Sequence, residues 1–138
     1  QKIVLFDFGA TREITPALSN AYLALFKAGS NNDREGVLNA ATDIGYFKDS
    51  LKDNYKEKVI DLFLMACEPL RYNGEFDFKN SALASNIKDA GLQLSAQSQQ
   101  WHTPPVDALF IHRKLAGLYL IAARLEAKID IKALFSYY

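Results

Sequence analysis

The side chain with the clearest capacity for chemistry is Asp7, which follows a short apolar run. That run, Lys2 to Phe6, has the β-branched and apolar composition of a buried strand, and Phe8-Gly9 provides a turn directly after it. A carboxylate at a rigid strand end, beside a glycine that lets the backbone turn, suits a divalent cation such as Mg²⁺. An aspartate that merely ends the strand and caps the turn is the alternative, and the tripeptide alone leaves both interpretations open.

The other reactive residue types favour packing roles. Cys67 is the single cysteine, so it cannot form an internal disulfide, and it stands on the apolar face of a predicted helix. His112 has no second His or Cys at a metal-like spacing, and His102 is too distant in sequence to form a helical pair with it. Trp101 precedes two prolines and is interpreted as core or rim packing rather than as a contact for lipid or a partner. The mixed charges of Lys48 to Lys58 indicate a solvated face.

The composition of the 138 residues excludes several classes of protein. With 49% hydrophobic and 23% charged residues, the chain is neither disordered, nor collagen-like, nor a small disulfide scaffold. Sixteen Lys and Arg balance sixteen Asp and Glu, so no global basic excess indicates a nucleic-acid binder. The longest apolar run, Leu115 to Ala123, is shorter than the roughly 20 residues of a membrane-spanning helix, and no transmembrane segment is expected.

Cap and breaker signals predict a mainly α fold, with one N-terminal strand and about six helices. Asn73-Gly74 predicts a tight turn in the loop between the third and fourth helices. The predicted helices run from Thr15-Pro16 to Gly29, from the capping box Asn32 and Glu35 to Gly45, over Val59 to Cys67 with a stop at Pro69, from about Phe78 to Leu94 with Asp77 as cap, from Val106 to Ala127, and from Asp130 to Tyr138.

The predicted helix from Val106 to Ala127 is apolar nearly all round, apart from His112-Arg113-Lys114, and is expected to be central and buried. A buried guanidinium needs a carboxylate, because an unpaired buried charge is strongly destabilising. We therefore expect Glu13 and Arg113 to form an ion pair that connects the strand's exit to this helix. Structural roles are also preferred for Arg12 and Glu13 over roles in a site.

Asp-Phe-Gly after a buried strand is also the metal-binding motif of protein kinases. Here, however, Gly9 is followed by Ala-Thr-Arg-Glu and the chain enters a helix at Pro16, which leaves no room for a peptide-docking activation loop. The segment from Leu5 to Glu13 resembles the corresponding segment of the UbiB/AarF (ADCK) family of atypical kinases.

Two further segments resemble motifs of the same family, in the same order along the chain. These are Glu75-Phe-Asp-Phe78, and Pro104-Pro105 followed by Leu109-Phe-Ile-His-Arg-Lys-Leu-Ala-Gly117. The chain departs from the family pattern at Ala116, where a glycine is usual. The three segments are spread over most of the sequence, from Leu5 to Gly117.

The resemblance implies that residues 1–138 form a partial kinase-like domain, a C-terminal lobe beginning at the Asp-Phe-Gly motif. The N-lobe and catalytic loop would precede Gln1, so the chain alone is expected to be inactive. Asp7 would bind Mg²⁺, with Phe8 and Gly9 positioning it, and Mg²⁺ and ATP would be cofactors of the full-length protein.

The Gly-Ala-Thr-Arg-Glu form points to the branch of the family associated with coenzyme Q (ubiquinone) biosynthesis. The partners implied are a nucleotide, a lipid or quinone precursor, and proteins of a biosynthetic complex, with no nucleic acid among them. The implied location is peripheral to the bacterial inner membrane on the cytoplasmic side, or to the mitochondrial inner membrane on the matrix side. The competing hypothesis is a non-catalytic helical module that binds a protein or lipid and carries a coincidental Asp-Phe-Gly.

Overall fold

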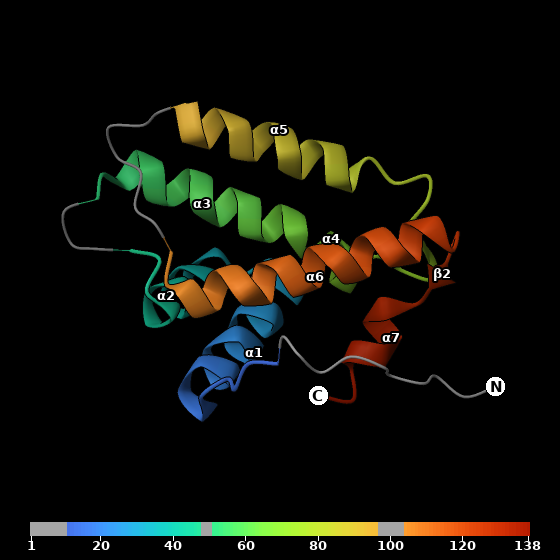
Figure 1. Cartoon of the computed structure of the whole chain (residues 1–138), viewed down its shortest axis with the longest axis horizontal. Coiled ribbons are helices and arrows are strands. Elements are labelled where there is room, and N and C mark those ends of the chain that lie inside the picture. The colour runs from blue at the N-terminus through green and yellow to red at the C-terminus, as the bar shows by residue number, and fades with distance from the viewer. Residues whose placement is uncertain (1–10, 48–50, 97–103) are drawn as a thin grey trace.

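The computed structural model describes residues 11–47, 51–96 and 104–138, and within these ranges the fold is mainly α, as predicted (Figure 1). The predicted strand from Lys2 to Phe6 lies outside the described residues. The elements are α1 (Pro16–Ser30), α2 (Arg34–Ile44), α3 (Asp53–Ala66), α4 (Glu68–Arg71), β1 (Phe76–Asp77), α5 (Leu83–Ala96), α6 (Val106–Arg124), β2 (Lys128–Ile129) and α7 (Ile131–Phe135).

The ends of α1 and α2 follow from local capping. Thr15 caps α1, since its hydroxyl accepts a hydrogen bond from the Leu18 amide at 3.3 Å, and this confirms the predicted start. The N-cap of α2 is Asp33 rather than the expected Asn32, because the Asp33 carboxylate accepts from the Gly36 amide at 3.0 Å. Gly45 ends α2 with a φ of 98°, a left-handed conformation that glycine adopts readily.

The main core lies where α1, α2 and α3 meet. Its most deeply buried large side chains include Leu25 of α1, Val37 of α2 and Ile60 of α3, which are 1%, 0% and 2% exposed. Helix α3 begins earlier than predicted, at Asp53, and ends at Ala66, before Pro69, which lies in the first turn of α4. These helices therefore bury their apolar faces against one another.

A small antiparallel sheet organises the opposite end of the molecule. Phe76 pairs with Ile129 and Asp77 with Lys128, and Phe76 and Phe78 share a second buried cluster with Leu83. Strands of two residues give no periodicity, which is why the sequence did not predict them. Helix α5 starts at Leu83 rather than Phe78, since the Asp77 carboxylate caps the turn that precedes the helix instead.

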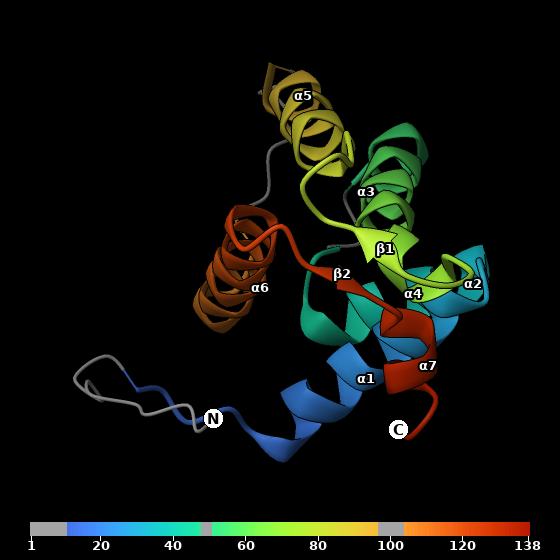
Figure 2. The same cartoon turned by 90° about the vertical axis from the view of Figure 1, so that its right-hand side faces the viewer.

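Helix α6 is not the buried central helix that was predicted. Ala108 is its single buried residue, and α6 lies in front of the other helices in Figure 1 and at the edge of the bundle in Figure 2. Apolar composition all round a helix indicates burial only if neighbouring elements surround it, and the described elements cover α6 on one side. The last predicted helix is confirmed in part: Asp130 caps α7, which ends at Phe135.

Candidate functional site

The residues with the strongest predicted chemistry, Asp7, Phe8 and Gly9, lie outside the described residues. Their roles at a metal and nucleotide site therefore stay predictions. Trp101 and His102 fall outside the described residues as well.

The described residues nearest to that motif are attached to the start of α6. The Arg12 guanidinium forms an ion pair with the Asp107 carboxylate and lies over the Phe110 ring, 4.8 Å from its centroid. Asp107 stands in the first turn of α6, where an acidic side chain also interacts favourably with the helix dipole. The segment that follows the Asp-Phe-Gly motif thus has a fixed contact 95 residues further along the chain.

The ion pair expected between Glu13 and Arg113 is not formed in the described structure. Both side chains are exposed, so the argument that a buried Arg113 requires a carboxylate does not apply. The connection to α6 is made one residue earlier, by Arg12 and Asp107. The sequence carries no signal for this choice, because Arg12 and Glu13 are adjacent charged residues and Asp107 is distant.

His112 lies in a cluster with two tyrosines from other elements. Its Nε2 atom is 2.8 Å from the Tyr46 hydroxyl and 3.2 Å from the Tyr22 hydroxyl, and its ring stacks on Tyr46 with an interplanar angle of 17°. Burial lowers the pKa of His112 and raises the pKa values of Tyr22 and Tyr46. All three side chains are therefore neutral near pH 7.

This His112 cluster is a packing and hydrogen-bonding contact between α6, α1 and the residues after α2. It contains no carboxylate or thiol that would make the histidine a base or a metal ligand within the described structure. The preferred interpretation of His112 as a satisfied packing histidine agrees with this geometry. Tyr22 and Tyr46 were not identified as its partners, since they are 90 and 66 residues away in sequence.

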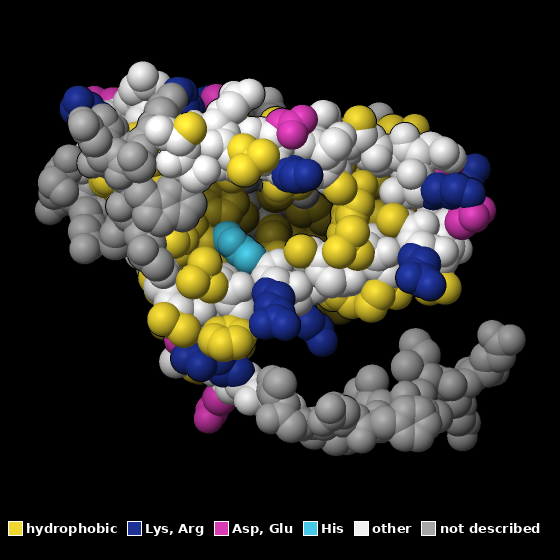
Figure 3. Space-filling view, turned by 45° about the horizontal axis from the view of Figure 1, so that its top comes forward, with side chains coloured by type: hydrophobic (Ala, Val, Ile, Leu, Met, Phe, Trp, Pro, Cys, Tyr) yellow, Lys and Arg dark blue, Asp and Glu magenta, His cyan; other side chains and the backbone are white. Residues whose placement is uncertain are grey.

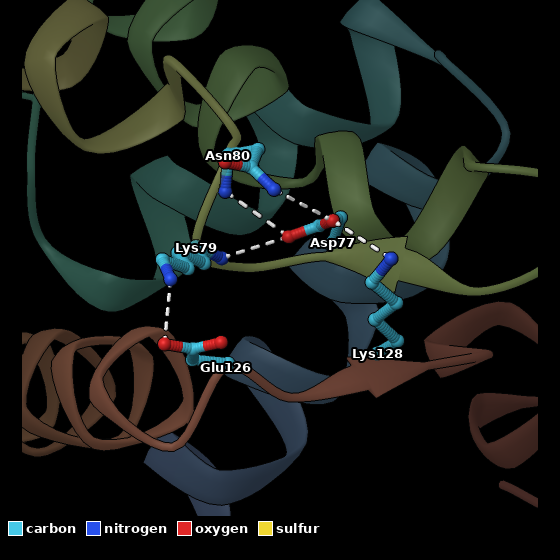
Figure 4. Close-up of polar contacts among 5 residues, drawn as sticks. All are labelled: Asp77, Lys79, Asn80, Glu126 and Lys128. Atoms are coloured by element: carbon cyan, nitrogen blue, oxygen red, sulfur yellow. Dashed lines mark hydrogen bonds and ion pairs between the residues drawn. The ribbon is translucent and has the colours of Figure 1, made fainter.

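Asp77 is the centre of a second polar network (Figure 4). Its carboxylate accepts hydrogen bonds from the Lys79 and Asn80 amides at 3.1 and 3.0 Å and from the Asn80 side-chain nitrogen at 3.0 Å. Lys128 Nζ lies 3.3 Å from the same carboxylate, and Lys79 Nζ lies 2.5 Å from Glu126. The hydrogen bonds from Asn80, followed by Lys128, lower the pKa of Asp77 to about 2.

The Asp77 network closes the loop between β1 and α5 onto β2. Both carboxylate oxygens of Asp77 already accept bonds from protein groups, so the carboxylate is engaged in shaping this turn rather than open to a ligand. The family-like segment Glu75-Phe-Asp-Phe78 thus has a structural role here: its two phenylalanines fill the second core cluster and its aspartate fixes the turn.

The described residues offer neither a metal cluster nor a reactive thiol. Over residues 11–47, 51–96 and 104–138, no three His, Cys, Asp or Glu side chains come together in a way that would hold a metal ion. Cys67 is 2% exposed, and its burial raises the pKa of the thiol to about 11, so it is protonated and packed, as predicted. Nor does any helix in these ranges have the length and apolar character needed to cross a membrane.

Comparison with known proteins identifies relatives along the whole chain, although no family model matches it. The chain is 30% identical over 134 residues to "Atypical kinase COQ8B, mitochondrial" of Rattus norvegicus, a match that covers 97% of this chain and 25% of that protein. It is 30% identical over 138 residues to "Atypical kinase COQ8, mitochondrial" of Saccharomyces cerevisiae, covering 98% and 27%. "Probable serine/threonine-protein kinase abkA" of Dictyostelium discoideum is 25% identical over 145 residues, covering 100% of this chain and 25% of that protein.

The chain therefore spans about a quarter of the length of these relatives, while the relatives match nearly all of the chain. These similarities agree with the motifs around Asp7, Asp77 and His112 and with the mainly α fold. The chain belongs to the UbiB/AarF (ADCK) family of atypical kinases.

Proposed function

We propose that this chain is the C-terminal lobe of a UbiB-type atypical kinase or ATPase that supports ubiquinone biosynthesis, with Mg-ATP chemistry residing in the full-length protein. The observation that carries the proposal is the 30% identity, over 97% and 98% of the chain, to two proteins named as COQ8 atypical kinases. The Gly-Ala-Thr-Arg-Glu segment after Asp7-Phe8 supports the assignment to the coenzyme Q branch.

In this proposal Asp7 is a ligand of Mg²⁺, and Phe8 and Gly9 position it. When bound, the ion would neutralise negative charge on the nucleotide phosphates. The described residues supply no cluster of metal ligands of their own. Because the N-lobe and catalytic loop would lie outside these 138 residues, the chain alone is expected not to turn over ATP.

The described residues contribute a fixed attachment for the residues that follow the motif in sequence. Arg12 is attached to Asp107 and Phe110 of α6, and Thr15 caps α1. This attachment is the support that the described lobe offers to the proposed site.

The setting is proposed from the relatives, several of which carry the word mitochondrial in their names. The protein would act at the matrix side of the mitochondrial inner membrane, or at the cytoplasmic side of the inner membrane in a bacterium. Its partners would be a nucleotide, a lipid or quinone precursor, and proteins of the biosynthetic complex.

The test is a nucleotide titration of the full-length protein and its Asp7→Asn variant, followed by thermal unfolding with and without Mg²⁺. A ligand that binds the native state raises its melting temperature, so we expect a Mg²⁺-dependent shift that is strongly reduced in the variant. Asp33→Asn, a substitution at the α2 cap far along the chain from the motif, serves as the matched control. Equal Mg²⁺-dependent shifts in wild type and Asp7→Asn would remove Asp7 from the metal role.

A second candidate is the non-catalytic interaction module, which the exposed apolar surface of α6 favours. The same titration separates the two functions. A full-length protein that shows no nucleotide-dependent shift under any Mg²⁺ condition would support the interaction module and contradict the kinase or ATPase assignment.

A further inference from the structure

Helix α6 exposes more large apolar side chains than any other helix in the described structure. On its outer face, Leu109, Phe110, Leu120 and Ile121 are 43%, 47%, 62% and 57% exposed. Apolar surfaces of this extent on one element mark an interaction site, whereas single exposed hydrophobic residues are ordinary. The space-filling view of the face that carries α5 and α6 shows hydrophobic side chains beside Lys and Arg, around a hollow lined with hydrophobic groups (Figure 3).

Six exposed residues on the outer face of α6 form three rows along the helix. Leu109 and Leu120, Phe110 and Ile121, and Arg113 and Arg124 are each eleven residues apart, which is close to three helical turns. At about 100° per residue, the arginine row lies between the two apolar rows, about 40° from the leucine row and about 60° from the Phe110 row. The outer face is therefore an apolar surface with a line of positive charge along its middle.

These cations lack acidic partners in the described part of the chain. Arg113 and Arg124 form no ion pair there, and the single acidic residue of α6, Asp107, is already paired with Arg12. A surface that covers the two apolar rows would also desolvate the arginines between them. Such a cover must carry carboxylates, because a desolvated unpaired guanidinium is unfavourable.

This arrangement favours a protein segment over a lipid surface. Helices that lie in a membrane interface keep their cations away from the centre of the apolar face, so that the charges reach the headgroups while the apolar side chains enter the acyl region. In α6 the arginines run between the apolar rows, where insertion into lipid would bury them. An amphipathic segment with acidic side chains fits both the apolar rows and the row of arginines.

The length of the relatives indicates where such a segment would come from. The chain spans 25% and 27% of two COQ8 relatives, so a family member of that length has about three times as much additional polypeptide. The face is also next to the start of the described chain, since Arg12 lies over Phe110 at one end of it. A segment covalently attached nearby has a high effective concentration at this surface.

We propose that the outer face of α6 is the docking surface for an amphipathic, acidic segment of the same full-length polypeptide, lying outside these 138 residues. The segment packs apolar side chains on the Leu109 and Phe110 rows and places carboxylates opposite Arg113 and Arg124. The proposal depends on membership of the family and not on nucleotide chemistry, so a negative Mg-ATP titration leaves it standing.

The test measures the accessibility of α6 in the full-length protein, in a background without other reactive cysteines. The Leu120→Cys variant is labelled with a maleimide, and the Asn39→Cys variant, at an exposed position of α2, is the matched control. Cys67 is buried and serves as a low-reactivity internal reference. We expect labelling at position 120 to be at least about tenfold slower than at position 39, since covered sites react only on opening.

Three results would overturn the proposal. Equal labelling of the two positions would mean that nothing covers α6. Protection that disappears on about hundredfold dilution would identify a second copy of the chain as the cover, because association depends on concentration. Protection that appears only with vesicles of anionic phospholipid would identify a lipid surface instead.

The acidic character of the segment has its own test in the same protein. Arg124→Glu places a negative charge opposite the proposed carboxylates, so the Leu120→Cys thiol should label several-fold faster in this variant. Lys88→Glu, a charge reversal at an exposed position of α5, should leave that labelling rate unchanged. An unchanged rate in Arg124→Glu would contradict the proposed charge pairing.

Discussion

Helices α1 to α3 and helix α6 place their apolar side chains in opposite ways. The first three bury their apolar faces in a shared core, where Leu25, Val37 and Ile60 are almost inaccessible. Helix α6 buries Ala108 and leaves most of its large apolar residues exposed. The hydrophobicity of a helix therefore shows that it needs a covering surface. It does not show whether that surface comes from the same 138 residues.

The ion pairs also differ between the α1–α3 region and α6. In the α1–α3 region, Arg34 of α2 forms ion pairs with both Glu57 and Asp61 of α3, two helices that already pack together. Helix α6 is attached by contacts at a few points: the Arg12 pair at its start, the His112 cluster, and the packing of Tyr119 on Phe78. The α1–α3 region should therefore carry most of the stability, and α6 should respond mildly to substitution.

The largest expected effect tests this division directly. Leu25→Ala removes a side chain that is 1% exposed and leaves a cavity in the core, so it should lower the free energy of unfolding by about 2–5 kcal/mol. Leu120→Ala, at 62% exposure, should change it by less than about 0.5 kcal/mol in the 138-residue chain. Urea unfolding followed by circular dichroism measures both. Similar losses for the two variants would contradict the division.

The second expected effect compares two glycines. A Cβ on Gly29 would lie 2.4 Å from Cys67 Sγ and 2.9 Å from its Cβ, so Gly29→Ala should destabilise the chain by about 1–3 kcal/mol. A Cβ on Gly117 of α6 meets nothing within 4 Å, and Gly117→Ala should stabilise the helix by up to about 1 kcal/mol. The melting temperatures should move in opposite directions.

The Gly29 prediction has an internal control in its contact partner. Replacing Cys67 by alanine removes the sulfur atom, the nearer of the two clashing atoms, and should recover part of the stability lost in Gly29→Ala. If the double variant is no more stable than Gly29→Ala alone, the loss of stability at position 29 does not come from the contact with the Cys67 sulfur.

Local signals in the sequence predicted those parts of the fold that depend on local chemistry. Thr15-Pro16, Gly45 and Asp130 each act through hydrogen bonds or backbone angles within a few residues, and each marks a helix end in the structure. The cap of α2 was misassigned by one residue, because Asn32 and Asp33 are both good caps and only the structure shows which side chain reaches the Gly36 amide.

The contacts of His112 and Arg12 and the exposure of α6 depend on residues far apart in the sequence, so local signals could not predict them. Tyr22 and Tyr46 meet His112, and Arg12 meets Asp107, across 66 to 95 residues, and no periodicity encodes such contacts. The predicted burial of α6 was wrong because apolar content identifies a helix that needs a cover without saying what supplies the cover. The proposed Asp7 site depended on a motif and a family resemblance, and it stays a prediction.

The third expected effect concerns the His112 cluster, one of the points where α6 is attached. Burial lowers the pKa of His112 in the folded state, so the unfolded state binds a proton first as the pH falls. The stability that this cluster contributes is present above the unfolded pKa of about 6.5 and is lost as the pH falls toward the folded pKa. The loss cannot exceed about 1.4 kcal/mol per pH unit, because one proton is involved.

The measurement is urea unfolding between pH 7.5 and pH 5 for wild type and His112→Phe, which cannot titrate at this position. The difference in unfolding free energy between the two should fall as the solution is acidified. Tyr46→Phe, which retains the ring but loses the hydroxyl 2.8 Å from His112, should cost about 0.5–1.5 kcal/mol at pH 7.5. A difference that stays constant with pH would contradict the buried, neutral histidine.

The smallest expected effect is at the Arg12 and Asp107 pair, where the described N-terminal segment meets α6. Both side chains are about half exposed, so a double-mutant cycle with Arg12→Gln and Asp107→Asn should give a coupling of about 0.2–1 kcal/mol. Because salt at about 1 M shortens the Debye length to about 3 Å, the coupling should nearly vanish there. The Lys79 and Glu126 pair, at the β1–β2 end of the molecule, provides a matched exposed control.

A substitution of Phe110 distinguishes the two contacts of Arg12, the ion pair with Asp107 and the contact with the Phe110 ring. Phe110→Leu removes the aromatic face over which Arg12 lies but retains apolar bulk, so it should weaken the salt-resistant part of the Arg12 contribution and leave the coupling to Asp107 in place. If the Arg12 contribution disappears fully in high salt even with Phe110 present, the ring contact adds nothing. Arg12 would then be held to α6 by screened charge alone, and its position would depend on ionic strength in a way that the α1–α3 core would not.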